Sequence, residues 1–482
     1  MRDSAGSHGD DLSSPTTYFI RTFGCQMNVA DSLDYARVLE DLGCVRGEDD
    51  ISSDILVINT CSVRAKAEEK AISYVGAVSR ERRERRQRTG ERERGGIAFV
   101  GCMATVRGEE IRRRFHEVRL ILPAKELRSF EDRLIEVWPE LVGTRAGIEA
   151  LPLLRPEERF ERFVPIVRGC VCKCTYCIVP TARGDRIESR APSEILREVE
   201  RLIDAGVKSI TFLGQNVCSY GTEIGAASSD VPVAWRDIPA GYGFAELLAD
   251  IRNRFSSADV WFKFLTTHPR DVTDGLMEVI ASDPAFSRHF HLPLQAGDDE
   301  VLRRMGRGYS SEDYLSLIDR IRAKIPDMRL TTDLIVGFPG EDERAFENTL
   351  AMVRRTGFDA AFTFLYSPRA GTPAEKWADP IPREEKRRRL QELIAVQNQI
   401  TIERARRKVG DERDVFVEGP ATGASVRGSG MVAGRTREEE VVALPGDEED
   451  YGRRVRARLK EALLRSFIGD RIDARHPGAS GY

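Results

Sequence analysis

Short apolar runs alternate with amphipathic stretches in the first part of the chain, from residue 16 to residue 138. The strand-like runs are TYFIRTF (17–23), ILVINT (55–60) and IAFVG (97–101). Residues 28–44 and 63–78 follow the first two runs, and their apolar positions recur with the period of a helix. Strands that alternate with helices predict a parallel sheet. We therefore expect a three-layer α/β domain over residues 16–138.

The same alternation continues between residues 156 and 402. The strand-like runs begin near residues 209, 261, 289, 328 and 359, and the helical stretches between them include 271–282, 311–325 and 342–357. In the helical stretch 191–207, Ile195, Val199 and Leu202 lie on one face, and Gly206 suits the C-terminal cap. This alternation predicts a full or partial α/β barrel, whose chemistry lies at the carboxyl ends of its strands.

Three other segments break or end this pattern. Residues 222–244 are rich in Gly, Ala, Ser and Pro, and we interpret them as a surface insertion. Residues 405–472 hold short apolar runs separated by turns that contain glycine, which is typical of a small all-β barrel of the oligonucleotide-binding type. The ends, 1–15 and 473–482, are expected to be disordered tails, and the first lacks the apolar centre of a secretory signal.

Composition narrows the class of protein. The chain has 482 residues, 41% of them hydrophobic, and no apolar run approaches the length that spans a bilayer. Nine cysteines without a secretory signal favour the reducing cytoplasm, where thiols serve metals or catalysis. The formal net charge of −4 gives no general basic excess, so any contact with RNA must come from local patches.

One densely charged run, residues 79–96, has no apolar stripe. We interpret it as a solvated helix end followed by a loop. The alternative is a contact with RNA phosphates, because its arginines outnumber its acidic residues.

The run RGCVCKCTYCIVP holds Cys170, Cys174 and Cys177 with the spacing Cys-x3-Cys-x2-Cys. Three thiolates at this spacing can bind three irons of a [4Fe–4S] cube and leave the fourth iron open to a substrate group. A structural zinc site would need a second pair of ligands, and no second Cys-x2-Cys pair occurs in the sequence. A disulfide framework does not suit a long chain that is poor in cysteine. The pattern favours a cluster over zinc or free thiols.

Three further cysteines, Cys25, Cys61 and Cys102, each follow the end of a predicted strand. Ligands of open α/β sheets bind at that edge, so these cysteines are expected to converge there. One buried cysteine would mean little, since free cysteine is common in protein interiors. Three at the same topological position predict a second cluster.

The spacing around Cys170 and its flanking residues resemble the radical S-adenosylmethionine (SAM) superfamily. The resemblance implies that SAM chelates the open iron through its amino and carboxylate groups. An electron from the cluster would then release a 5′-deoxyadenosyl radical. Cys172 lies inside the motif, where the superfamily usually has a residue without a thiol. We interpret it as a small side chain, with ligand exchange as the alternative.

The three regions together resemble the methylthiotransferase family, which joins a three-cysteine domain to a radical SAM core and a C-terminal TRAM domain. The phrases that carry the resemblance are TFGCQMNVADS, NTCSVRAKAEEK, GCMA, CTYCIVP, FLGQNVCSYG, TTHP, LPLQAG, TTDLIVGFPGE, YSPRAGTPA, VFVEGP, GRT and VVALPG. They imply domain limits of 16–138, 156–402 and 405–472. Two departures are Thr181, where a tyrosine is more usual, and one extra residue between Gly184 and Ser189.

Residues beside Cys25 and Cys61 are most similar to the branch of the family that modifies N6-isopentenyladenosine of tRNA. The resemblance implies an enzyme that converts this nucleoside, next to the anticodon, to its 2-methylthio derivative with SAM and two [4Fe–4S] clusters. Cys25, Cys61 and Cys102 would hold the first cluster, and Cys170, Cys174 and Cys177 the second, which binds SAM. We expect no catalytic side chain beyond these ligands, and a shared cavity that brings the two clusters face to face.

Other residues are candidates for binding. Those that could line the SAM pocket are Gly214, Gln215, Asn216, Asp333, Gly337, Gly340 and Glu341, although the glycines could equally form ordinary turns. Arg369 could hold a phosphate or the SAM carboxylate, or form a structural salt bridge. His268, His289 and His291 are interpreted as core histidines, and Cys44 and Cys218 as structural.

The expected partners follow from the same resemblance. The tRNA anticodon loop would be held through phosphate contacts of the TRAM segment and nearby arginines, and its unpaired bases could stack on aromatic side chains. An electron donor such as flavodoxin or ferredoxin, a monomeric state and a cytoplasmic location are expected, without a membrane.

Two alternatives stay open. The same chemistry could act on threonylcarbamoyl-adenosine of tRNA or on a ribosomal protein. A protein of another class, an RNA-binding protein with structural zinc and no catalysis, would also carry cysteines and basic patches.

Overall fold

The computed structural model describes residues 15–62, 65–90, 94–142, 160–224, 238–239, 241–422 and 430–472. The chain divides into two compact units, Met1–Leu153 with Thr181–Gly184, and Leu154–Pro180 with Asp185–Tyr482. The predicted tails 1–15 (apart from Pro15) and 473–482, and most of the predicted insertion 222–244, lie outside the described residues. In the part of the chain that is described, no helix combines the length and the apolar character needed to cross a bilayer.

The first unit is built on a parallel five-stranded sheet in the order β2-β1-β3-β4-β5. Its strands are β1 (Thr17–Phe23), β2 (Val45–Arg46), β3 (Ile55–Thr60), β4 (Gly96–Gly101) and β5 (Val118–Pro123). This is the strand order of flavodoxin-like doubly wound sheets, whose topological switch point lies between β1 and β3. The parallel sheet confirms the predicted α/β fold.

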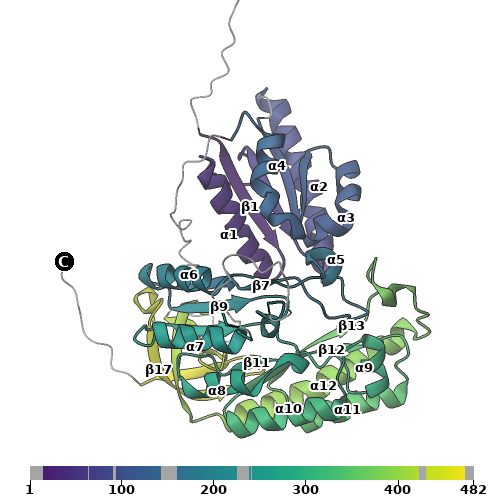
Figure 1. Cartoon of the computed structure of the whole chain (residues 1–482), viewed down its shortest axis with the longest axis vertical. Helices are drawn as coiled ribbons and strands as arrows, with labels where there is room; N and C mark the ends of the chain where they lie inside the picture. The colour runs from purple at the N-terminus through teal and green to yellow at the C-terminus, as the bar shows by residue number, and fades with distance from the viewer. Residues whose placement is uncertain are drawn as a thin grey trace, which may run out of the picture. The chain divides into compact units, whose positions relative to one another are not determined.

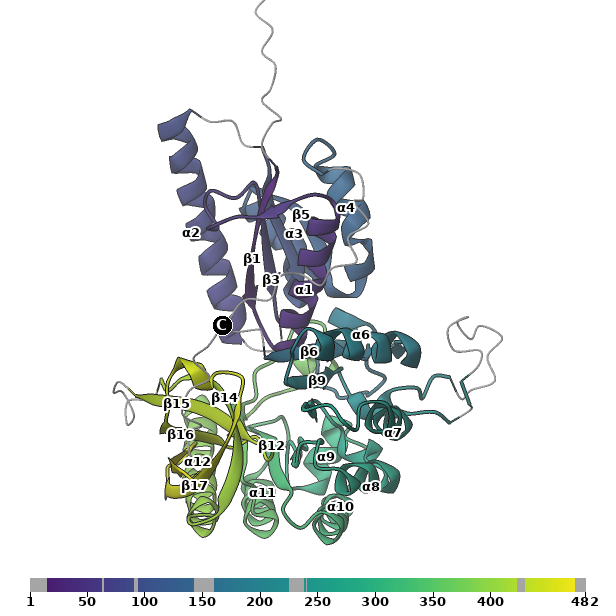
Figure 2. The ribbon, with the colours of Figure 1, turned by 90° about the vertical axis from the view of Figure 1, so that its left-hand side faces the viewer.

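Helices cover both faces of this sheet, which Figure 2 shows between α2 on one side and α1 with α4 on the other. They are α1 (Gln26–Asp41), α2 (Ala65–Thr89), α3 (Cys102–Arg114) and α4 (Phe130–Val137), with a 3-10 helix, η1 (Ala124–Ser129). Tyr35 of α1 and Phe130 of α4 pack on one face, and Val75 of α2 and Met103 of α3 pack on the other. Since both faces are covered, every residue of β3 and β4 is buried.

Helix α2 continues through the arginine-rich run as far as Thr89. Arg82 is buried there and donates to the backbone carbonyl of Ser53, and Arg83 pairs with Glu117 at 2.6 Å. The interpretation of this run as a solvated helix end followed by a loop agrees with the end of α2 at Thr89 and with the exposure of most of its helical residues. Arg82 differs, because its long side chain reaches back to the edge of the sheet and is buried there.

The second unit contains six parallel strands in a curved arrangement (Figure 1). They are β6 (Glu161–Pro165), β9 (Ser209–Leu213), β10 (Trp261–Phe264), β11 (His289–His291), β12 (Arg329–Val336) and β13 (Ala360–Leu365). Three of them pair as β10-β9-β6 and three as β11-β12-β13, and a parallel bridge between Phe262 and Phe286 joins the two sets. Among the described residues β13 does not pair with β6, so the predicted barrel is a partial one.

The remaining elements of this core complete the α/β alternation. The helices are α6 (Pro192–Asp204), α7 (Phe244–Arg254), α8 (Asp274–Ser282), α9 (Asp299–Met305), α10 (Ser311–Lys324), α11 (Glu343–Thr356) and α12 (Arg383–Arg407). A short helix, α5 (Val179–Arg183), is divided between the two units, because Thr181–Gly184 belong to the first. Two short strands, β7 (Val167–Arg168) and β8 (Glu188–Ser189), form a separate antiparallel pair. As predicted, Ile195, Val199 and Leu202 form the buried face of α6, and Gly206 follows its end with φ +85°.

The C-terminal segment forms a small closed barrel in the order β14-β15-β16-β18-β17. Its strands are β14 (Glu412–Pro420), β15 (Met431–Thr436), β16 (Val441–Pro445), β17 (Arg454–Ala462) and β18 (Phe467–Arg471). Val415, Val417 and Leu459 are among the residues that fill its centre. The predicted all-β barrel is confirmed. Helix α12 ends at Arg407 and β14 begins at Glu412. The domain limits at 402 and 405 stay predictions.

The turn between β15 and β16 anchors this barrel to the core of the same unit. Arg437 donates to the carbonyls of Phe286 and Asp283, both at 2.8 Å, just before β11 begins. Lys263 of β10 is only 4% exposed and pairs with Glu439 at 2.8 Å. The small C-terminal barrel therefore contacts the α/β core near the amino ends of the core strands. The carboxyl ends of the core strands stay available for a site.

Candidate functional site

The three cysteines predicted in the first unit lie at the carboxyl ends of β1, β3 and β4. Cys61 and Cys102 are buried, each 3% exposed, whereas Cys25 is exposed at the start of α1. The Cys61 thiol hydrogen-bonds to the sulfur of Cys25, and this is the main cause that lowers the pKa of Cys25 to about 6. Cys102 lies close enough for its charge to interact with that of Cys25. The structure thus gathers the three sulfurs around the β1/β3 switch point.

Two buried asparagines hold the turns that carry these cysteines. The side chain of Asn28 donates to Asn59 Oδ1 at 2.9 Å and to the carbonyl of Thr60 at 3.1 Å. Asn59 in turn donates to the carbonyl of Asn28 at 2.8 Å. The Cys25 thiol itself donates to Asn28 Oδ1 at 3.4 Å. This reciprocal pair ties the start of α1 to the end of β3 and so sets the spacing of Cys25 and Cys61.

An arginine from a distant part of the sequence completes this site. Arg183, in the segment that folds with the first unit, donates from Nε to Cys102 Sγ at 3.1 Å. Its Nη2 pairs with Asp31 at 2.9 Å, and both side chains are buried. Burial alone would lower the pKa of Arg183, but Asp31 and the sulfurs of Cys102 and Cys25 raise it. A guanidinium held this way would also stabilise thiolate ligands of a metal cluster.

The second triad lies in the loop between β7 and α5. The thiols of Cys170, Cys174 and Cys177 interact electrostatically with one another, so the structure brings them together. Arg307, which is buried, donates to Cys174 Sγ at 3.3 Å, and the backbone N–H of Val179 donates to Cys177 Sγ at 3.5 Å. Burial raises the pKa of Cys177 to about 12. Hydrogen bonds to the sulfurs are one of the features that tune a cluster held by thiolates.

The loop of the second triad is fastened to helix α9. Thr175 donates its backbone N–H to the carbonyl of Met305 at 3.0 Å and its hydroxyl to the carbonyl of Arg304 at 2.8 Å. Gly306 ends that helix with φ +70°, and a Cβ there would lie 2.5 Å from the carbonyl oxygen of Lys173. Only glycine fits this close approach without a shift of the cysteine loop.

Cys172 has neighbours that its sequence position does not reveal. Its thiol hydrogen-bonds to Cys170 and lowers the pKa of that residue. Its sulfur, a ring nitrogen of His268 and a carboxylate oxygen of Asp271 all lie within 4.8 Å of one another. Burial lowers the pKa of His268 to about 3, so this ring is neutral. Asn216, one of the predicted SAM-pocket residues, joins the group by donating to Asp271 at 2.6 Å.

The other predicted SAM-pocket residues are spread over two places. Gly214 and Gln215 follow β9 next to Asn216, and a Cβ on Gly214 would lie 2.3 Å from the side chain of Val167. Asp333 belongs to β12, and its carboxylate lies 3.5 Å from His291 Nε2. The assignment of these residues to a SAM pocket stays a prediction.

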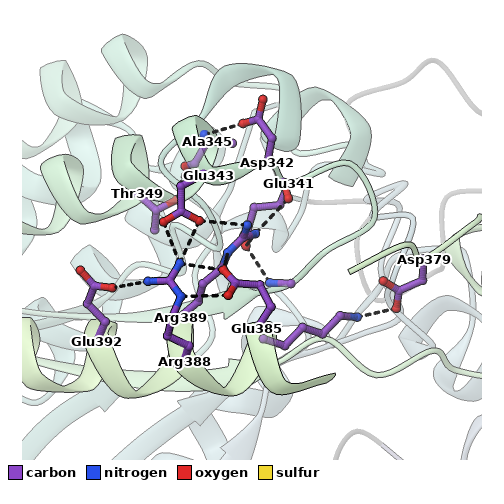
Figure 3. Close-up of polar contacts among 12 residues, drawn as sticks. Glu341, Asp342, Glu343, Ala345, Thr349, Asp379, Glu385, Arg388, Arg389 and Glu392 are labelled. Carbon is purple, nitrogen blue, oxygen red and sulfur yellow. Dashed lines mark hydrogen bonds and ion pairs between the residues drawn. The ribbon is translucent and has the colours of Figure 1, made fainter. Parts of the chain in front are cut away.

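Gly337, Gly340 and Glu341 lie in the turn between β12 and α11, where each has a packing role. Figure 3 shows Glu341 held by Arg389 of α12, whose Nη1 lies 3.0 Å from its carboxylate. The Glu341 carboxylate also accepts a hydrogen bond from the backbone N–H of Gly337 at 2.8 Å. Burial raises the pKa of Glu341. A Cβ on Gly340 would lie 2.6 Å from Arg304 Nε. These contacts hold the turn in place. A SAM-binding role for Gly337, Gly340 and Glu341 stays a prediction.

The remaining candidates lie in the same unit. Arg369 follows β13 and is half-buried, and its backbone carbonyl accepts from the Thr372 hydroxyl at 2.8 Å. A role of its side chain in binding stays a prediction. His289 and His291 both hydrogen-bond to the Thr331 hydroxyl, at 2.7 and 3.0 Å, as side chains of the sheet.

Sequence reasoning missed three residues that shape the two triads: Asn59, Arg183 and Arg307. Asn59 precedes Cys61 within the phrase NTC, so a polar residue inside an otherwise apolar strand was the available signal. Arg183 and Arg307 had none, because each acts on a cysteine that is distant in the sequence.

Comparison with known proteins agrees with this arrangement. Residues 17–123 match the family described as "Uncharacterized protein family UPF0004", and residues 164–353 match the Radical SAM superfamily. Among solved structures, the radical S-adenosylmethionine methyltransferase TsrM from Kitasatospora setae aligns with a TM-score of 0.52 over 85% of this chain and 79% of that chain. At 12% identity this likeness concerns the fold alone.

Two curated relatives match over almost the whole chain. The tRNA-2-methylthio-N(6)-dimethylallyladenosine synthase of Carboxydothermus hydrogenoformans is 39% identical over 461 residues, which cover 93% of this chain and 97% of that protein. The protein of the same name from Syntrophomonas wolfei is 40% identical over 475 residues, which cover 96% and 99%. The chain therefore belongs to the family of the tRNA-2-methylthio-N(6)-dimethylallyladenosine synthases, within the radical SAM superfamily.

Proposed function

We propose that this chain converts N6-isopentenyladenosine, next to the anticodon of tRNA, to 2-methylthio-N6-isopentenyladenosine. Relatives that carry the name of this activity match nearly the whole chain, including all three of its regions. The observation that carries the proposal is the pair of cysteine triads. Cys25, Cys61 and Cys102 gather at one sheet edge, while Cys170, Cys174 and Cys177 gather in one loop.

Both triads suit [4Fe–4S] clusters by the chemistry of their donors. Each offers three thiols and an arginine that donates to one sulfur, Arg183 to Cys102 and Arg307 to Cys174. Thiolate sulfur is the ligand that such clusters need, and hydrogen bonds to the sulfurs tune their potential. We assign the first triad to the cluster that provides sulfur and the second to the cluster that binds SAM.

The reaction requires cofactor chemistry because the target hydrogen is inert to acids and bases. Tuning by a protein shifts a pKa by only about 3–5 units, too little for a base to remove the C2 hydrogen of adenine. When bound, SAM and the clusters supply the radical, the sulfur and the methyl group that replace C2–H by C2–S–CH3. The chain's own residues hold the cysteines in place, and Arg183 and Arg307 compensate their negative charge.

Finer points of the proposal concern partners. Local arginines of the TRAM barrel and its neighbours would hold the anticodon loop by its phosphates. Flavodoxin or ferredoxin would supply electrons. We further propose that the enzyme works as a monomer in the cytoplasm, where its tRNA substrate is found.

The decisive test is nucleoside mass spectrometry on tRNA from a strain that lacks the gene. The deletion should remove 2-methylthio-N6-isopentenyladenosine and leave N6-isopentenyladenosine, and the gene on a plasmid should restore the product. Anaerobic reconstitution should bind about eight irons per chain. Persistence of the product, without a second enzyme to account for it, would refute the proposal. If the deletion instead removes a methylthio group from threonylcarbamoyl-adenosine or from a ribosomal protein, that molecule is the substrate in place of N6-isopentenyladenosine.

A further inference from the structure

Phe362 is unusual among the aromatic residues of this protein. It is 54% exposed, and every other Phe, Tyr or Trp in the described part of the chain is buried or half-buried. It is the third residue of β13, and among the described residues β13 pairs with β12 alone. An exposed aromatic ring therefore lies at the open edge of the partial barrel.

The register of the sheet shows which face carries this ring. Phe362 lies beside Asp333 in the parallel pairing of β12 with β13, and Thr331, two residues earlier on β12, lies beside His291. Residues two apart on a strand share a face, so His291, Asp333 and Phe362 lie on the same side. Leu330 and Leu334 alternate with them and are fully buried on the other side.

Helix α12 packs on β12 and β13, so an exposed ring must lie on the face that this helix leaves uncovered. That face is the concave side of the partial barrel, since the helices of such folds cover the outer side. Ring positions on that side are within reach of a substrate that enters through the open edge.

Neighbouring side chains hold the ring in one orientation. The His291 ring meets the Phe362 ring edge to face, with centroids 5.9 Å apart and planes at 71°. His291 is itself held by the Thr331 hydroxyl at 3.0 Å and by the Asp333 carboxylate at 3.5 Å. The His291 ring thus supports the phenyl ring on one side, while Phe362 stays 54% exposed.

We propose that Phe362 is a stacking platform for an unpaired base of the RNA substrate. This inference rests on the proposed function and adds to it the residue that recognises the splayed base. Proteins that bind single-stranded RNA stack unpaired bases on aromatic side chains, and any base can stack because all have a π face. Asp333, beside the ring, offers an acceptor for an amino group of that base.

The same ring could in principle stack on the adenine of SAM, so the test separates the two sources. The holoenzyme, with both clusters reconstituted, is titrated with a labelled RNA hairpin whose loop carries N6-isopentenyladenosine beside the anticodon. Binding is compared for the wild type, Phe362→Leu and Phe362→Trp. Phe362→Leu keeps an apolar side chain without a π face, and Phe362→Trp enlarges that face.

We expect Phe362→Leu to weaken binding of the hairpin by roughly 5- to 150-fold, the range that one stacked base contributes. Phe362→Trp should bind within about 3-fold of the wild type or tighter. A blunt RNA duplex of equal length has no unpaired base, so Phe362→Leu should leave its affinity unchanged. SAM affinity, measured without RNA, should also be unchanged.

Ile394→Ala is the matched control, since Ile394 is another exposed apolar residue of the same unit, 37% exposed on α12. It should bind the hairpin like the wild type. Iron content and thermal melting confirm that each variant is folded and loaded.

Four results would overturn the proposal: wild-type affinity of Phe362→Leu for the hairpin, an equal loss for the duplex, a loss of SAM affinity alone, or failure of Phe362→Trp to bind. Each of these is compatible with tRNA modification by the wild type, so the proposed function would stand. If the wild type neither binds the hairpin nor modifies it, the proposed function itself fails.

Discussion

Cys102 depends on a glycine that no other residue can replace. Gly101 has φ +97°, and a Cβ there would lie 2.5 Å from both Asn59 Oδ1 and the Thr60 carbonyl oxygen. The positive φ alone costs about 1–2 kcal/mol for a residue with a Cβ. Gly101→Ala should therefore displace the Asn28–Asn59 pair and move Cys102, and iron bound after anaerobic reconstitution should fall from about eight to about four per chain.

Gly43→Ala is the control for this change. Gly43 also has a positive φ, +80°, but a Cβ there meets nothing within 4 Å. It should bind iron like the wild type, since the backbone cost is similar and no contact is broken. Full iron content in Gly101→Ala would show that the asparagine pair does not position the first triad.

The buried pair of Arg183 and Asp31 makes a second prediction at this scale. Removing one partner of a buried pair leaves an uncompensated charge, which costs about 3–5 kcal/mol. Arg183→Met should lower the free energy of unfolding of the apo protein by that amount in a urea titration, and Asp31→Asn added to it should recover part. Arg107→Met breaks a half-exposed pair with Glu110 and should cost less than about 1 kcal/mol. If Arg183→Met and Arg107→Met lower the free energy of unfolding equally, the loss of Arg183 does not leave an uncompensated buried charge.

Single residues also show where sequence-based prediction stops. Cys25, Cys61 and Cys102 could be placed together because each follows an apolar run, and parallel strands end at a common edge. Arg183 could not, since 81 positions separate it from Cys102 and an isolated arginine has no periodic signal. Cys172 was noticed as unusual, but its contacts with His268 and Asp271 depend on the tertiary fold.

At the scale of elements, a buried arginine, Arg389, is one of the residues that join helix α12 to the core. Arg388 and Arg389 are neighbours that both contact Glu343 and Glu385 (Figure 3). Their side chains differ in exposure, 46% for Arg388 and 6% for Arg389, and only Arg389 also bonds Glu341. Arg389→Met should lower the free energy of unfolding by about 3–5 kcal/mol, because Glu341 stays buried without its cation.

Arg388→Met serves as the comparison, as it removes an exposed arginine with almost the same partners. Exposed pairs are screened by water and contribute little, so its melting temperature should stay close to that of the wild type. Thermal unfolding of the two variants side by side measures the difference. If Arg388→Met and Arg389→Met have the same melting temperature, burial of Arg389 does not control the attachment of α12.

Elements were predicted best where periodicity was strong. The buried face of α6 gave a clear pattern, and the structure has the helix and its glycine end as expected. The run 79–89 has no apolar stripe, and it forms the end of α2 as interpreted from its charge. The burial of Arg82 against the sheet edge was not predicted, because hydrophobic periodicity gives no signal for a buried arginine.

At the scale of the whole molecule, the small barrel was identified from weak strand patterns, but its attachment was not. Arg437 bonds to Phe286, 151 positions away, and Lys263 is buried against Glu439. Such contacts are invisible until the strands are placed. They place the barrel in one compact unit with the core that carries the second triad.

The two triads belong to separate compact units, and this division predicts how the enzyme fails when either is damaged. On the proposed assignment, Cys174→Ala removes a ligand of the SAM-binding cluster, so SAM cleavage should stop. Cys61→Ala damages only the first unit, so SAM should still be cleaved to 5′-deoxyadenosine while no methylthio product forms. Each variant should keep about four irons, because each compact unit contains the cysteines of one triad. Chromatography of 5′-deoxyadenosine and mass spectrometry of the tRNA nucleosides measure the two outcomes. Loss of all iron in either variant, or wild-type product from Cys61→Ala, would show that the triads do not act as separate cluster sites.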